Sequence, residues 1–271
     1  SYAEFLRKQG RFDEAIEHYK KAIDYSPGFL ASHKGLADSY LFKGEYGLAR
    51  EQYRNYYKRL SGNYSKFNAL FLEASVDLHE NNLEAAMKTM DKYTDLAEEL
   101  DLPFYKVSGE IYKGYILCER GKTEDGWKHY SKAIYMMKEV GLGENTNENT
   151  ENLSHLVEFS GLTSNGDLAK AENARQKCEK RLTKSGKPDD WQRYYRMWGI
   201  LEMKKGNYRQ ARKYLAKAYE HPMKWYYMGL VWEKSGNQRK ARKWYEKVAN
   251  HYDNSIDLGI FRNKALAGLK E

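Results

Sequence analysis

The sequence predicts an all-α protein built from a stack of helical hairpins. Three observations predict this fold: a turn residue that recurs seven times, a small residue at a fixed distance after each turn, and a helix-favouring composition. Ala, Leu, Lys, Glu and Tyr dominate the chain, whereas Val, Ile and Thr, which favour strands, are sparse. Aromatic residues make up 14% of the chain, more than a disordered protein carries, so we expect a folded protein.

The turn residues are Gly or Asn, which enter the left-handed backbone region most readily and therefore end the first helix of each hairpin. They are Gly10, Gly44, Asn81, Gly121, Gly166, Gly206 and Gly236. Five positions later stands a small residue that lets the second helix approach the first: Ala15, Ala49, Ala86, Gly126, Ala171, Ala211 and Ala241. Most first helices carry a small residue of their own: Ala3, Ala37, Ala74, Gly114, Gly199 and Gly229. In the fifth copy Phe159 and Ser160 stand there instead, which predicts a distorted or re-registered first helix.

This pattern resembles the tetratricopeptide repeat family, which has a small residue in each helix, a Gly-Asx-Tyr-like turn, a Tyr or Phe, and a terminal Pro. The first repeat matches from Gly10 through Pro27, and the resemblance extends over essentially all 271 residues. Successive turn residues are 34, 37, 40, 45, 40 and 30 positions apart, and the first interval equals the family's usual period. The resemblance implies a right-handed α-α superhelix forming a single domain over residues 1–271. Its seven hairpins are expected at 1–27, 30–61, 67–102, 104–143, 152–186, 191–221 and 223–250, and a C-terminal capping helix at 255–270.

The ends of the chain and one internal stretch depart from the repeat. The chain begins without Met and inside a repeat, so we expect it to be a fragment of a longer protein. Near the other end, Ser255 precedes an apolar stripe that includes Ile260 and Leu269, as the inner face of a terminal solenoid helix requires. Between Gly143 and Glu151 the sequence is polar and lacks periodicity, which predicts a mobile surface loop.

Charge is distributed unevenly over the chain. The net charge is +8, but residues 166–250 hold 22 Lys and Arg against nine Asp and Glu. The stretch before residue 166 has more acidic than basic residues. The basic stretch indicates either an ordinary solvated helix surface or a surface that attracts an anionic partner. Because the two parts carry opposite charge, head-to-tail self-association is also open.

Residue patterns for catalysis, metals or cofactors are missing from the sequence. There is no Gly-rich phosphate loop, no His-Glu-x-x-His and no Cys-x-x-Cys, and the seven histidines are dispersed. Cys118 and Cys178 lie in separate repeats and fit buried helix positions. No apolar run approaches membrane-spanning length. We therefore expect a protein that is not an enzyme, binds no cofactor and is located in the cytoplasm.

The resemblance also implies where partners bind, because the first helices of successive hairpins line the concave face in this family. Arg193 and Arg196 are expected either to pair with a carboxylate or phosphate or to stay hydrated. Lys34 is followed by Asp38 where chaperone-tail binders of the family have Asn, so binding of a chaperone tail is not expected. The expected partner-binding residues are Lys34, Asp38, Asn68, Phe71, His79, Tyr115, Arg193, Arg196, Lys204 and Tyr226.

The expected function is a protein-interaction scaffold that binds a peptide segment or another protein. A first alternative is binding of RNA or another polyanion, because Trp and Tyr alternate with Lys and Arg between Trp191 and Trp244. These aromatic residues are also ordinary packing residues of the repeat. A second alternative is a regulatory repeat domain of a larger signalling enzyme.

Overall fold

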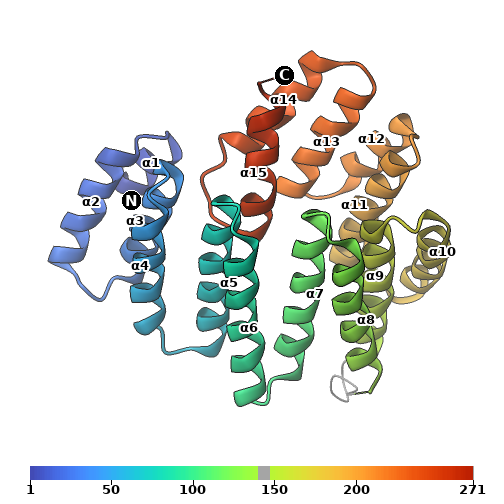
Figure 1. Cartoon of the computed structure of the whole chain (residues 1–271), viewed down its shortest axis with the longest axis horizontal. Coiled ribbons are helices and arrows are strands. Elements are labelled where there is room, and N and C mark those ends of the chain that lie inside the picture. Colours follow the sequence, from blue (N-terminus) through green and yellow to red (C-terminus); the bar gives the residue numbers. More distant parts are fainter. Residues whose placement is uncertain (140–146, 271) are drawn as a thin grey trace. The chain divides into compact units, whose positions relative to one another are not determined.

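The structure is a computed structural model that describes residues 1–139 and 147–270, and in these ranges it has fifteen helices and no strand (Figure 1). The prediction of an all-α fold is confirmed. The helices are α1 (Tyr2–Lys8), α2 (Phe12–Tyr25), α3 (Leu30–Lys43), α4 (Tyr46–Lys58), α5 (Asn63–His79), α6 (Leu83–Glu99), α7 (Pro103–Glu119), α8 (Thr123–Glu139), α9 (Asn147–Asn165), α10 (Leu168–Ser185), α11 (Pro188–Lys204), α12 (Tyr208–Lys217), α13 (Pro222–Lys234), α14 (Gln238–Ala249) and α15 (Ile256–Gly268).

The predicted turn residues end the first helices of the hairpins. All seven have positive φ, from 61° at Asn81 to 90° at Gly44. Gly44 is the C-cap of α3, and its N–H donates to the carbonyl oxygens of Leu41 and Tyr40. A side chain is disfavoured in this left-handed conformation, which explains why Gly recurs there.

The predicted small residues lie where the two helices of a hairpin touch. Ala15, Ala49 and Ala211 have no exposed surface. α7 and α8 approach each other closely where Gly114 and Gly126 face each other. A Cβ atom on Gly126 would lie 2.8 Å from the carbonyl oxygen of Gly114, which is too close for any side chain. The helix spacing therefore depends on these residues staying small.

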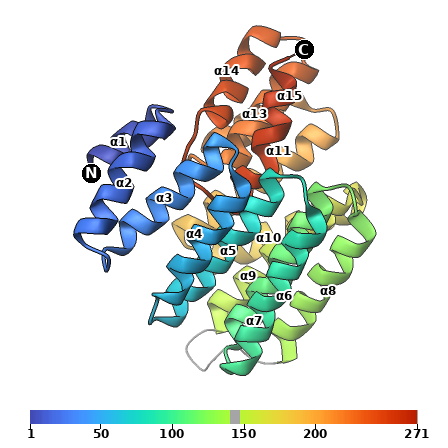
Figure 2. The ribbon, with the colours of Figure 1, turned by 60° about the vertical axis from the view of Figure 1, so that its left-hand side comes forward.

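The chain folds into two compact units. Unit 1 comprises Ser1–Tyr93 together with the chain from Glu246 onward, and unit 2 comprises Thr94–Tyr245. In unit 1 the hairpins α1/α2 and α3/α4 stack through α2 and α3, and α4 packs on α5 (Figure 2). In unit 2 the hairpins α7/α8, α9/α10 and α11/α12 stack in order, followed by α13. The prediction of a single domain over residues 1–271 stays a prediction.

The last helix forms where the sequence predicts it, with one contact that the sequence did not indicate. Ser255 is the N-cap, and its Oγ accepts a hydrogen bond from the N–H of Leu258 at 3.2 Å. The helix packs on α5, far back in the sequence. Of the predicted stripe, Ile260 is fully buried and Leu269 is half-buried.

Two local predictions differ in part from the structure. Of the two outcomes expected for the fifth first helix, distortion is absent from α9, which continues through Phe159 and Ser160, whereas the close contact is shifted along the helix, as re-registration predicts. Phe159 is fully buried, and Gly161 provides the close contact instead, with a Cβ there 2.9 Å from atoms of Trp127 and Tyr130 in α8. In the predicted loop, residues 144–146 lie outside the described residues. Residues 147–150 belong to α9, so the loop prediction is wrong for them.

Within the described ranges, none of the helices combines the length and the apolar character that crossing a bilayer requires.

Candidate protein-interaction surfaces

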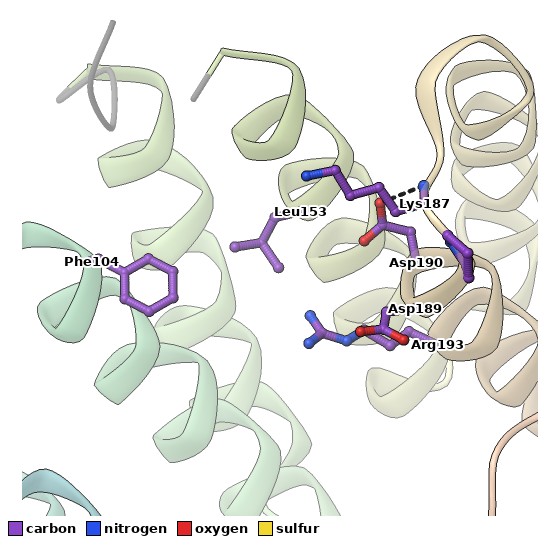
Figure 3. A pocket seen from close by; sticks show the side chains of 7 residues that line it. Phe104, Leu153, Lys187, Asp189, Asp190 and Arg193 are labelled. Atoms are coloured by element: carbon purple, nitrogen blue, oxygen red, sulfur yellow. Dashed lines mark hydrogen bonds between the residues drawn. The ribbon is translucent and has the colours of Figure 1, made fainter. Parts of the chain in front are cut away.

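The first helices of unit 2 form one continuous face. α7 packs on α9, and α9 packs on α11, so these three helices are neighbours although α8 and α10 separate them in the sequence. A pocket of about 550 Å³ opens on this face (Figure 3). It is lined by Phe104, Leu153, Lys187, Pro188, Asp189, Asp190 and Arg193.

The apolar residues that line the pocket are Phe104, Leu153 and Pro188. Phe104 follows Pro103 in the first turn of α7, and 56% of its surface is exposed. Leu153 is half-buried on α9, and Pro188 begins α11. Figure 3 shows Phe104 and Leu153 on one side of the pocket and Lys187, Asp189, Asp190 and Arg193 on the other. An exposed phenyl ring beside a pocket is a feature of binding surfaces.

The polar side of the pocket has a carboxylate that already accepts hydrogen bonds, Asp190, and a cationic side chain without an ion-pair partner among the described residues, Arg193. The Lys187 N–H donates to Asp190 Oδ2 at 3.2 Å, and Asn152 Nδ2 lies 3.4 Å from the same oxygen. Asp190 thus caps α11 and is held in place. Arg193 is exposed and has no salt-bridge partner in the part of the chain that the structure describes. Its guanidinium is free to bind a carboxylate.

Asn152 holds the part of α9 that carries Leu153, a role that was not predicted from the sequence. The side chain is fully buried. Its Nδ2 donates to the carbonyl oxygen of Ser185 at 3.1 Å, and its Oδ1 accepts from Arg181 Nε at 3.2 Å. A lone Asn in a polar stretch carries no sequence signal for such a position.

The other predicted binding residues of unit 2 lie among packed neighbours. Tyr115 is buried, and Lys204 Nζ donates to the carbonyl oxygen of Ser164 at 3.1 Å. Arg196 donates to Tyr219 Oη at 2.7 Å and lies over that ring. Burial raises the pKa of Tyr226 to about 12. Of the five residues predicted in this unit, Arg193 lines the pocket.

The five predicted residues of unit 1 lie on α3 and α5. Lys34 pairs with Asp38 at 2.9 Å, and the Asp38 side chain is only 1% exposed. Asn68 is exposed, whereas Phe71 is half-buried and stacks on Tyr93 with ring centroids 4.5 Å apart. His79 is buried, and its carbonyl oxygen accepts a hydrogen bond from Asn263 of α15 at 2.6 Å. The chain's own C-terminal residues therefore contact this face.

The aromatic residues of the basic stretch are engaged with each other and with cations of the same chain. Trp198 stacks on Tyr214 with centroids 3.5 Å apart, and the Arg175 guanidinium lies 4.4 Å from the Trp198 ring. The Arg212 guanidinium and the Lys240 ammonium lie 4.2 and 4.1 Å from the centroid of the Trp232 ring. These contacts are cation–π interactions that stabilise the hairpins.

The described residues give little support for a metal site or for a reactive cysteine. No group of His, Cys, Asp and Glu there has the arrangement of a metal site. Cys118 and Cys178 are buried, and burial raises the pKa of each thiol to about 12. At neutral pH both remain thiols, which are poor nucleophiles and poor metal ligands.

Comparison with known proteins agrees with this architecture. Two tetratricopeptide repeat models match the chain, one at residues 6–56 and one at residues 34–99 and 196–255, and together they cover more than half of it. Anaphase-promoting complex subunit 7 of Mus musculus is 34% identical over 122 residues, and the protein of the same name from Homo sapiens is 32% identical. The match covers 45% of this chain but only 20% of either relative.

A solved structure resembles nearly the whole chain. It is a tetratricopeptide repeat protein from Parabacteroides merdae, with a TM-score of 0.51 and 14% identity over 99% of this chain and 95% of that one. At this identity the likeness concerns the fold. The repeat models, the positive-φ turns and the small residues between paired helices lead to one conclusion. The chain belongs to the tetratricopeptide repeat family.

Proposed function

We propose that this protein is a protein-interaction module and that the pocket on α7, α9 and α11 holds a peptide segment of another protein. The observation that carries the proposal is the pocket itself, because it joins an exposed phenyl ring to an unpaired guanidinium on a continuous helical face. Peptides that bind in helical grooves are usually held by apolar anchors, with charged groups setting their orientation.

The lining residues define the chemistry of the peptide. An apolar side chain would fill the space between Phe104 and Leu153, which no residue of this chain fills among those described. An acidic group of the peptide would pair with Arg193. Asp189 on the same rim would repel a second carboxylate placed beside it, which limits the peptide to one acidic group at this point.

The relatives support a role in assembly. Two of them are named as subunits of a complex, the anaphase-promoting complex. This chain spans only a fifth of their length, so the inference for this protein is limited to binding another protein and does not extend to a place in that complex. Self-association stays a prediction, and comparing the molar mass at low and high salt tests it.

Selection from a random peptide library tests the proposal. We expect the selected peptides to share an apolar residue and an acidic residue. Phe104→Ser and Arg193→Glu should each weaken binding about tenfold or more, because each removes a contact that the peptide needs. Arg209→Glu is the matched control, because Arg209 is an exposed basic residue on α12 outside the pocket. Selected peptides that bind all three variants as tightly as the wild type would contradict the proposal.

A further inference from the structure

On the first-helix face of unit 1 lies a segment of the chain that follows α14. We call residues 250–255 the strap; they are extended or irregular and lead directly into α15. Arg7 of α1 donates to Asp253 Oδ1 of the strap at 2.8 Å. The same guanidinium lies 3.6 Å from the buried Asp38 of α3. The strap thus supplies a second carboxylate to an arginine that is 4% exposed.

Asn254 makes the most specific contacts of the strap, and its side chain is buried. Its Nδ2 donates to Tyr53 Oη at 2.8 Å and to the carbonyl oxygen of Leu72 at 3.2 Å. Its Oδ1 accepts from Ser75 Oγ at 2.6 Å. The Tyr53 hydroxyl in turn donates to Asp38. The amide therefore uses both its donor and its acceptor on groups of α4 and α5, more than 170 residues away in the sequence.

Aromatic contacts hold the strap at Tyr252. The Tyr252 ring meets Phe12 and Phe42 edge-on, with centroids 5.1 and 5.4 Å apart. Tyr252 also lies 3.6 Å from the position of a Cβ on the turn residue Gly10. Edge-to-face contacts of this kind add specificity to an apolar pocket.

The helix after the strap approaches α5 closely. A Cβ on Gly259 would lie 2.8 Å from the backbone oxygen of Ser75 and 2.9 Å from Leu78. Asn263 Nδ2 donates to the carbonyl oxygen of His79 at 2.6 Å. Leu258, Ile260 and Phe261 are fully buried. Extended segments and helices with one apolar face are both recurring forms in which peptides bind to proteins.

We infer that the first-helix face of unit 1 is a second peptide-binding groove, whose ligand is an extended Tyr-Asp-Asn-Ser segment leading into an apolar helix, and that the chain's own strap and α15 occupy it. Arg7 selects the aspartate, the Tyr53–Leu72–Ser75 triplet selects the asparagine, and Phe12 and Phe42 select the aromatic ring. A partner segment with the same side chains binds in place of the strap. This groove is separate from the pocket of unit 2 and does not depend on the function proposed for that pocket.

The covalent attachment of the strap makes it a strong competitor. A ligand tethered in the same chain acts at an effective concentration of the order of millimolar, so a free peptide binds weakly while the strap is docked. The apparent affinity falls by the fraction of molecules in which the groove is open. Loosening the strap without changing the groove should therefore reveal the intrinsic affinity.

The test uses the full chain and a fluorescein-labelled synthetic peptide of residues 250–270, with fluorescence anisotropy as the readout. Gly259→Leu forces α15 away from the Ser75 backbone but leaves the groove residues unchanged. We expect it to bind the peptide at least about tenfold more tightly than the wild type. Ala267→Leu is the matched control, because Ala267 is exposed on the same helix, and it should bind like the wild type.

A second substitution ties the binding to the groove. Adding Ser75→Ala to Gly259→Leu removes the hydroxyl that donates to Asn254. The increase in peptide affinity caused by Gly259→Leu should then be lost. A folded Gly259→Leu chain that binds no better than the wild type would overturn the inference, as would a double variant that keeps the gain. If Gly259→Leu loses its helical circular dichroism, Asn254→Ala replaces it, because this change removes three hydrogen bonds of the strap and leaves α15 intact. The same two outcomes then decide.

Discussion

The two units use the same hairpin design but differ in what lies on their first-helix faces. In unit 1 the strap and α15 cover the face, and the predicted binding residues Asp38 and His79 are buried. In unit 2 the corresponding face has a pocket of about 550 Å³ with an exposed phenylalanine and an unpaired arginine. Turn residues and small residues thus determine how hairpins stack. Whether a face is open depends instead on a distant segment whose polar side chains match it.

The distribution of tryptophan allows the units to be followed separately. All six tryptophans lie between residues 94 and 245, in unit 2: Trp127, Trp191, Trp198, Trp225, Trp232 and Trp244. Tryptophan fluorescence therefore reports on unit 2, whereas far-UV circular dichroism reports on the helices of both units. Agreement or disagreement between the two signals shows which unit a substitution affects.

The largest effect is expected for Gly126→Leu in unit 2. The side chain has no space, because Gly114 O and Cys118 N lie 2.8 and 3.0 Å from the Cβ position and both are backbone atoms. We expect a loss of about 3 kcal/mol or more in the free energy of unfolding. The tryptophan-detected thermal midpoint should fall. Gly47→Leu on α4 is the control, because nothing lies within 4 Å of its Cβ position, and that midpoint should not move.

A smaller effect is expected from acid, through Glu110 on α7. Burial alone would raise the pKa of this carboxyl, but hydrogen bonds from His129 at 2.6 Å and Lys132 at 3.0 Å lower it to about 2. The folded-state pKa lies below the unfolded value of 4.5, so the contribution is fully present above pH 4.5 and is lost as the pH falls towards 2. The difference between these pKa values corresponds to at most about 3 kcal/mol.

Glu110→Gln tests this reasoning. We expect the tryptophan-detected stability of the variant to fall less steeply between pH 4.5 and pH 2 than that of the wild type. Glu124→Gln on α8 is the control, because this carboxyl is exposed. Parallel pH profiles for the wild type and Glu110→Gln would show that the ion cluster does not stabilise unit 2.

An effect of about 1.5 kcal/mol is expected for Tyr53→Phe in unit 1. The hydroxyl connects Asp38 to Asn254, so its removal leaves a buried carboxylate and a buried amide each without one partner. The circular dichroism transition should shift to lower temperature while the tryptophan transition stays in place. Tyr56→Phe, on the same helix and half-buried, should change neither signal. A shift of the tryptophan transition in Tyr53→Phe would mean that the two units unfold together.

The sequence predicted local features better than distant contacts. Gly44 and Ala49 could be placed because turn conformation and helix contact each require one residue type at a fixed spacing. The docking of α15 on α5 could not be predicted, because the apolar residues of α15 are equally suited to covering the preceding hairpin. Asn254 and Tyr53 are 201 positions apart, and no periodicity connects them.

The same distinction applies to the pocket. Arg193 was predicted because it falls on the repeated face of a first helix. Phe104 was missed because it lies in the first turn of α7, before the positions at which the repeat places binding residues. Leu153 was missed because the polar stretch before it was read as a loop. The repeated positions lie in the middle of the first helices, so they do not identify a pocket that is formed at helix ends.

The smallest effect is expected when single-stranded RNA is added at low salt. Binding by base stacking needs free aromatic faces, but Trp198 is stacked on Tyr214, and both Arg212 and Lys240 lie over the Trp232 ring. We expect a labelled strand to leave tryptophan fluorescence unchanged, even if phosphates attract it to the basic stretch. Strong quenching that survives moderate salt would mean that these rings leave their cation partners to stack on bases. In that case the open face of unit 2 would serve nucleic acid, and the contrast with unit 1 would be one of ligand class.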